Sequence, residues 1–137
     1  MVTFNILSEY SQDPPTEFGR FKIAVGPLYD LARVQALAED EDKLLAWTKK
    51  CRNDVGKFFA GDYAEVAALI KSLKDRDYID SEWCENGSGR IAACDAYKVR
   101  RVEEVPGTGK RDTFAYFLKF AIGKTGNLVL VVSCHTS

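Results

Sequence analysis

The chain has 137 residues, of which 46% are hydrophobic and 28% are charged, and its formal net charge is −1. This composition is typical of a single globular domain with a substantial core, and it argues against a disordered, collagen-like or coiled-coil chain. The longest aliphatic run, Leu128–Val132, is far too short to span a membrane. The N-terminus lacks a basic start followed by an apolar block, so we expect no export signal and a cytoplasmic protein.

Two short alternating segments, residues 2–7 and 21–25, predict strands in an N-terminal extension that covers residues 1–26. Between them, Asp13-Pro14-Pro15 predicts a loop. We expect the strands of this extension to belong to the same domain as residues 27–137.

Two helices are predicted in the segment that follows. The first begins after Gly26-Pro27, because apolar residues then recur at helical spacing as far as Leu37. The second covers residues 43–59 and can break near Thr48.

A third helix is predicted over about residues 62–75. Asp62, followed three residues later by Glu65, forms a capping-box pattern in front of an apolar helical face. Residues 76–89 are expected only to lead into a turn at residues 86–89.

Three segments rich in Val, Ile, Phe, Tyr and Ala predict strands over residues 90–102, 114–122 and 128–135. Hairpin turns at residues 106–109 and 124–127 separate them, so these strands form an antiparallel meander. Helices followed by a sheet indicate an α+β fold, with N-terminal helices packed on a C-terminal antiparallel β-meander.

Alternation along these strands divides their side chains between two faces. The face expected under the helices is interrupted only by Asp95 and Arg101. Its apolar members are Ile91, Ala93, Tyr97, Val99, Phe114, Tyr116, Leu118, Phe120, Ile122, Leu128, Leu130, Val132 and Cys134. The opposite, polar face carries Cys94, Lys98, Arg100, Phe117, Lys119, Ser133 and His135. Three cations without a carboxylate suit a phosphate backbone, with a base stacked on the aromatic ring.

The charge distribution along the chain agrees with an anion-binding surface in the last third. Residues 86–137 contain eight Lys and Arg against four Asp and Glu, whereas residues 1–85 contain 11 against 16. An uneven division by chance is the alternative interpretation, and it stays open at this point.

The polar face contains the residue types that a metal-independent ribonuclease requires. Such an enzyme needs a base for the 2′-hydroxyl, an acid for the leaving 5′-oxygen, and cations near the phosphorane. His135, the only histidine, could supply these functions together with Lys119, Lys98 and Arg100. The alternative is that His135 is an ordinary polar residue near the C-terminus.

The four cysteines show no C-x-x-C spacing, so we expect free thiols and neither a structural metal nor a cofactor. Cys94 and His135 fall on the same predicted face, which leaves a cysteine-dependent enzyme as a weaker hypothesis.

Four segments together resemble MqsR-family toxins, which are type II toxin–antitoxin ribonucleases with a RelE-like fold. The segments are Leu73–Tyr78, Cys94–Tyr97, Tyr116–Phe120 and Leu130–His135. The corresponding family patterns are a helix ending in "L-x-x-x-D-F", then "W-Q-D-V-Y", "Y-L-K" and a terminal "S-F-K". Residues 29–34 also resemble the opening helix of the family, so the similarity covers residues 28–137.

This resemblance implies a cytoplasmic mRNA interferase that cuts RNA without a metal and is neutralised by a cognate antitoxin protein. Several family positions are substituted: the terminal lysine falls on His135, the glutamine on Cys94, the tyrosine of "Y-L-K" on Phe117, and a further lysine on Asp80.

We therefore expect an endoribonuclease whose partners are mRNA and an antitoxin, with no membrane association. The expected catalytic residues are His135, Lys119, Lys98 and Arg100. The expected substrate-binding residues are Phe117, Tyr116, Tyr97, Ser133 and Cys94. The alternative is a non-catalytic module that binds RNA or protein.

Overall fold

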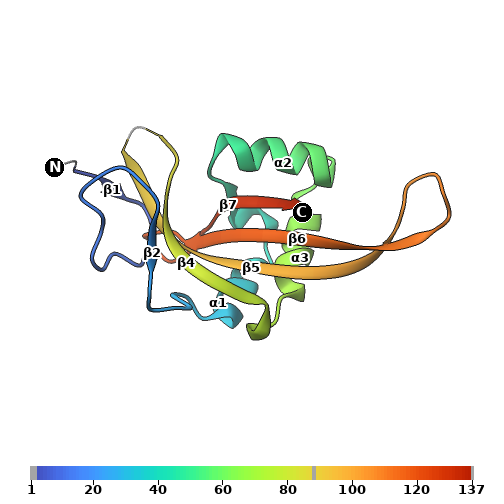
Figure 1. Ribbon diagram of the computed structural model, residues 1–137, viewed down its shortest axis with the longest axis horizontal. Helices are drawn as coiled ribbons and strands as arrows, with labels where there is room; N and C mark the ends of the chain where they lie inside the picture. Colours follow the sequence, from blue (N-terminus) through green and yellow to red (C-terminus); the bar gives the residue numbers. More distant parts are fainter. Residues whose placement is uncertain (1–2, 88, 137) are drawn as a thin grey trace.

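The computed structural model describes residues 3–87 and 89–136, and within them seven strands form one mixed sheet (Figure 1). The strands are β1 (Asn5–Ile6), β2 (Phe21–Ile23), β3 (Leu44–Ala46), β4 (Tyr78–Glu85), β5 (Arg90–Glu104), β6 (Arg111–Ile122) and β7 (Val129–Thr136). Their order is β2-β4-β5-β6-β7-β3, and β1 lies beside the start of β5. The β1–β5 and β3–β7 pairs are parallel, and the other pairs are antiparallel.

Three α-helices are interspersed among the strands: α1 (Leu31–Leu37), α2 (Lys49–Phe59) and α3 (Tyr63–Ser72). Each begins at a side chain that accepts a hydrogen bond from a backbone N–H group of the first turn. The capping residues are Asp30, Thr48 and Asp62. Such caps satisfy donors that have no partner inside the helix. Short 3₁₀ turns, η1 (Glu41–Lys43) and η2 (Asp75–Asp77), precede β3 and β4.

The predicted fold class is wrong. N-terminal helices packed on a C-terminal antiparallel meander would leave the sheet to the last third of the chain. The structure instead has a seven-stranded mixed sheet to which the N-terminal half contributes three strands, with helices between strands. The segment at residues 1–26 contributes β1 and β2 to this sheet.

The predicted helix over residues 43–59 is wrong in its first part. Leu44, Leu45 and Ala46 form β3 and pair in parallel with β7, and the helix α2 begins only after its cap Thr48. Short apolar runs fit a helix and a buried strand equally well, so the pairing with β7 decided between them.

The sequence predicted only a segment leading into a turn over residues 76–89, but most of this segment forms strand β4. Its polar residues Asp80, Ser81 and Glu82 obscure the strand pattern in the sequence. Ser81 and Glu82 are nevertheless buried, because Ser81 donates to Asp95 and Glu82 is paired with cations. These partners are distant in sequence, so only the tertiary structure shows that β4 can enter the sheet.

The antiparallel meander of β5, β6 and β7 is confirmed, but the predicted faces of β7 are correct only in part. The register shifts opposite Lys119 and Phe120, so that Ser133 faces Lys119 while Val131 faces Phe120. Val132 is the extra residue of this β-bulge. Leu130 therefore shares a face with Lys119 rather than with Cys134.

The helices cover one face of the sheet, which we call the helix-covered face. Cys51 of α2 lies against Cys134 of β7, with their sulfurs 3.6 Å apart, and Phe59 packs against Tyr116 with ring centroids 5.8 Å apart. Asp95, buried on this face, accepts hydrogen bonds from the backbone N–H groups of Leu28 and Tyr29. This carboxylate thereby ties the segment before α1 to the centre of the sheet.

Candidate functional site

The face opposite the helices carries the polar residues predicted from strand alternation, and we call it the open face. Its members are Lys98, Arg100, Phe117, Lys119, Ser133 and His135. Lys98 lies opposite Phe117, and Phe117 lies opposite His135, so these three side chains form one row across β5, β6 and β7. Lys119 and Ser133 form the neighbouring pair.

The row places a cation and an imidazole on either side of one aromatic ring. The Lys98 ammonium lies 5.1 Å from the centroid of the Phe117 ring, a cation–π contact. The His135 ring stacks against Phe117 with a centroid distance of 5.5 Å and an interplanar angle of 27°. Phe117, which the sequence suggested as a stacking surface for a base, therefore orients two groups capable of proton transfer.

His135 is held in a defined ring orientation. Its Nδ1 lies 3.1 Å from the carbonyl oxygen of Thr136, and because a carbonyl can only accept, Nδ1 carries the hydrogen. In the neutral imidazole this leaves Nε2 as the acceptor. The His135 side chain is half-buried, and its ring packs against Phe117.

Lys119, one of the expected catalytic residues, is paired with a carboxylate. Its ammonium pairs with the carboxylate of Glu82 on β4, and the Glu82 side chain is only 4% exposed. Lys22 and Arg20 also contact this carboxylate, at 3.1 and 3.2 Å. Burial by itself raises the pKa of Glu82, but the hydrogen bonds and charges of Lys119, Lys22 and Arg20 outweigh it and lower the pKa to about 2. The carboxylate therefore stays ionised and neutralises much of the charge of Lys119.

Arg100 and Ser133 are accessible on the open face, whereas Cys94 is not. Arg100 is exposed and lies opposite Ala115, and Ser133 is half-buried beside Lys119. Cys94 is fully buried, its thiol donates to the carbonyl oxygen of Ala92, and burial raises its pKa well above the ordinary value. A thiol in this state is a poor nucleophile, which argues against the cysteine-dependent enzyme.

Tyr97 and Tyr116 lie on the helix-covered face, away from the row. Tyr97 is 1% exposed and stacks on Phe120 with a centroid distance of 5.3 Å. The Tyr116 hydroxyl donates to Glu103, and burial together with this hydrogen bond raises the pKa of Tyr116 to about 12. The structure does not bring these two residues together with the other predicted site residues.

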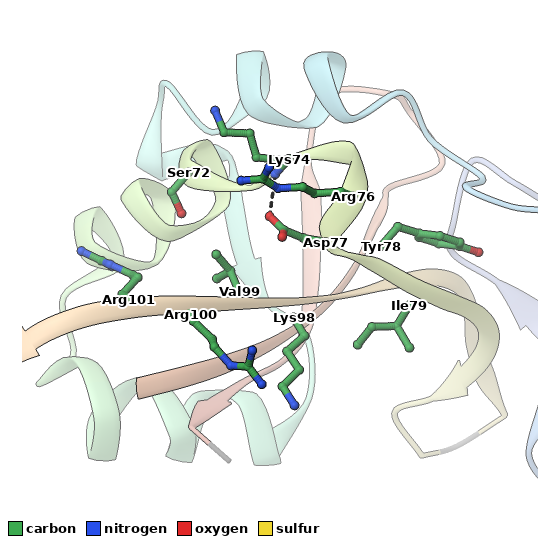
Figure 2. Close-up of a pocket in the computed structure, with 10 residues that line it drawn as sticks. All are labelled: Ser72, Lys74, Arg76, Asp77, Tyr78, Ile79, Lys98, Val99, Arg100 and Arg101. Carbon is green, nitrogen blue, oxygen red and sulfur yellow. Dashed lines mark hydrogen bonds between the residues drawn. The ribbon is translucent and has the colours of Figure 1, made fainter. Parts of the chain in front are cut away.

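A cationic groove of about 610 Å³ borders the open face at the start of β4 (Figure 2). It is lined by residues of β5 and by residues from the end of α3 to the start of β4: Ser72, Lys74, Arg76, Asp77, Tyr78, Ile79, Lys98, Val99, Arg100 and Arg101. Sequence reasoning missed the contribution of Lys74, Arg76 and Arg101. The signal was available in part, because Lys74 and Arg76 stand together just before the unrecognised strand.

Neither a metal site nor a membrane helix is found in the part of the chain that the structure describes. Residues 3–87 and 89–136 contain no group of three or more His, Cys, Asp and Glu side chains arranged to hold a metal ion. Within the same residues, no helix has the length and apolar character needed to cross a membrane. Comparisons of the chain with protein-family models, curated proteins and solved structures returned no match.

Proposed function

We propose that the open face binds single-stranded RNA in the cytoplasm and cleaves it by attack of a 2′-hydroxyl on the adjacent phosphate, without a metal. The observation that carries this proposal is the row Lys98–Phe117–His135, which joins a proton acceptor and a cation through one ring. Arg100 adds an exposed guanidinium beside Lys98. This combination suits a reaction in which a proton is removed on one side of a phosphate and returned on the other.

The roles follow from the positions of the side chains. His135 Nε2 accepts the proton of the 2′-hydroxyl, and the 2′-oxygen forms the new bond to phosphorus. The bond from phosphorus to the 5′-oxygen breaks, and the Lys98 ammonium protonates the leaving oxygen. Arg100 stabilises the additional negative charge on the phosphorane. The products are a 2′,3′-cyclic phosphate and a 5′-hydroxyl end, so atoms and protons balance.

A toxin component of a toxin–antitoxin system is the biological setting that we propose for this activity. RNA cleavage in the cytoplasm stops translation, so unrestrained expression should arrest growth. A protein antitoxin would then be the natural partner of the chain.

The proposal is tested with the purified protein, a single-stranded RNA and EDTA in the buffer. We expect cleavage that yields 2′,3′-cyclic phosphate ends, and a rate about 10²- to 10⁴-fold lower for His135→Ala, the range for loss of a general base. Lys124→Gln, at the β6–β7 turn on the far end of these strands, is the control and should cleave like the wild type. Growth arrest on induced expression should follow the same pattern.

Two results would contradict the proposal. Equal cleavage by wild type and His135→Ala would exclude His135 as the base. RNA binding without cleavage by the wild type would favour the non-catalytic RNA-binding module, a function with which the neutralisation of Lys119 by Glu82 agrees.

A further inference from the structure

The edge of β5 that faces β4 is paired over only part of its length. The last aligned pair between β4 and β5 is Tyr78 with Tyr97, whereas β6 remains paired with β5 as far as Glu104 and Arg111. Among the residues that the structure describes, no strand pairs with residues 98–104 on this side. Figure 1 shows this part of β5 and β6 extending beyond the body of the molecule as a two-stranded arm.

The backbone groups of alternate residues on β5 point to this free edge. On the side of β4, the Arg90 N–H donates to the Gly87 carbonyl oxygen, and the Arg90 carbonyl oxygen accepts from the Asn86 N–H. On the side of β6, the Val105 N–H donates to the Lys110 carbonyl oxygen. The register on β5 is continuous between these positions, so even-numbered residues keep the direction of Arg90.

Arg100 and Val102 therefore direct their N–H groups to the free edge. The Val102 carbonyl oxygen has one weak partner, the Arg111 guanidinium at 3.4 Å, and the Val102 side chain is 57% exposed. Natural proteins normally protect such an edge, or use it to receive a strand from another chain.

Cations lie on both sides of the free edge. Figure 2 shows Lys98 and Arg100 on one side of the β5 ribbon and Lys74 and Arg76 on the other. A strand added in the plane of the sheet points its side chains alternately to the two sides. If the added strand were acidic, its side chains on either side would therefore meet a cation. Asp77 is the carboxylate among the residues that line the groove, and it accepts the Lys74 backbone N–H at 2.8 Å, whereas Glu103 and Glu104 stand at the far end of the edge.

Arg101, on the same side as Arg76, is the remaining cation of the groove, and it lies 3.6 Å from the Glu103 carboxylate. At this distance and partial exposure the pair is weak, so Arg101 keeps most of its attraction for a further anion.

We propose that the free edge of β5, residues 98–104, receives an extended acidic segment of a protein partner as an additional strand of the sheet. Hydrogen bonds to the backbone of Arg100 and Val102 hold the segment, and its carboxylates pair with the cations on either side. The proposal shares Lys98 and Arg100 with the cleavage reaction, whereas the backbone edge, Lys74 and Arg76 belong to this proposal alone.

The test uses a fluorescein-labelled peptide of glutamate and valine, designed to present glutamate on both faces when extended, with binding followed by fluorescence anisotropy. Val102→Pro removes the N–H group at the free edge but leaves the bonds to β6 intact. We expect it to bind the peptide about tenfold more weakly than the wild type, whereas Val102→Ala, which keeps the N–H group, should bind normally. Circular dichroism verifies that both variants fold.

A second measurement keeps the test valid if Val102→Pro is poorly folded. The same peptide with N-methylated alternate amides has identical charge but cannot pair as a strand, so the wild type should bind it about tenfold more weakly. Arg76→Glu should weaken binding of the unmodified peptide, whereas Lys124→Glu, on the β6–β7 turn, should not.

Two outcomes would overturn the proposal. The first is equal binding of the N-methylated and unmodified peptides, and the second is unchanged affinity in a folded Val102→Pro protein.

Discussion

The carboxylate of Glu82 controls the charge at the border of the open face. It is buried in the sheet and contacts Lys119 on β6 together with Lys22 and Arg20, so its partners come from two separate segments of the chain. Lys22 also pairs with the more exposed Asp80 at 2.6 Å. A buried carboxylate without these partners would be strongly unfavourable, so the cluster is what allows β4 to lie beside β5.

Glu82→Gln should lower the free energy of unfolding at neutral pH by about 2 kcal/mol, less than for a fully buried pair because Arg20 and Lys22 remain largely in water. The lowered pKa of Glu82 stabilises the folded state fully above its ordinary value of 4.5, and this contribution disappears as the pH falls toward about 2. When urea unfolding is measured across this pH range, the free energies of unfolding of the wild type and Glu82→Gln should converge as the pH falls. Asp80→Asn is the control, and an equally large effect from it would contradict a special role for Glu82.

At the scale of elements, the start of α2 is joined to the bulge in β7. The Thr48 hydroxyl accepts the Cys51 N–H at 3.0 Å, as a helix cap, and donates to the Val132 carbonyl oxygen at 2.8 Å. Val132 is the extra residue that keeps Ser133 and His135 on the open face while Val131 faces the helices. The helix therefore fixes the strand irregularity on which the position of His135 depends.

Thr48→Ala should destabilise the protein by about 1 to 2 kcal/mol, because it removes both hydrogen bonds of the cap. Thr48→Ser keeps the hydroxyl and should retain most of the stability. Urea denaturation with a far-ultraviolet circular dichroism signal measures both. If the alanine and serine variants unfolded alike, the methyl group rather than the hydroxyl would be the stabilising part of Thr48.

At the scale of the whole molecule, a net charge of −1 conceals a cationic region. Acidic residues such as Glu39–Asp42 lie elsewhere, and the groove gathers Lys74, Arg76 and Arg101 beside the cations of the open face. A polyanion that binds there displaces counterions, so its affinity must fall with salt concentration.

Arg100→Gln should reduce the slope of log K against log salt concentration by about 0.7 for single-stranded RNA, if Arg100 contacts one phosphate. The measurement uses 2′-O-methyl RNA, which lacks the attacking hydroxyl, so that binding is observed without cleavage. Lys124→Gln should leave the slope unchanged. If the slope is unchanged for Arg100→Gln as well, Arg100 does not contact a phosphate of the bound RNA.

The sequence by itself determined those features that depend on neighbouring residues. Asp62 marked the start of α3, and period-two alternation identified β5 and β6 and placed Lys98 and Phe117 on one face. His135 was assigned to that face as well, but its position depends on a bulge that local alternation does not reveal.

Only the tertiary structure decided the features that depend on partners far apart in the chain. Residues 44–46 form strand β3 because they pair in parallel with β7. Glu82 can be buried in β4 because Lys119, 37 positions away in the sequence, neutralises its charge. The same ion pair neutralises much of the charge of Lys119, one of the expected catalytic residues. Strand pairing and buried charge are long-range interactions, so local propensity and residue spacing carry little information about them.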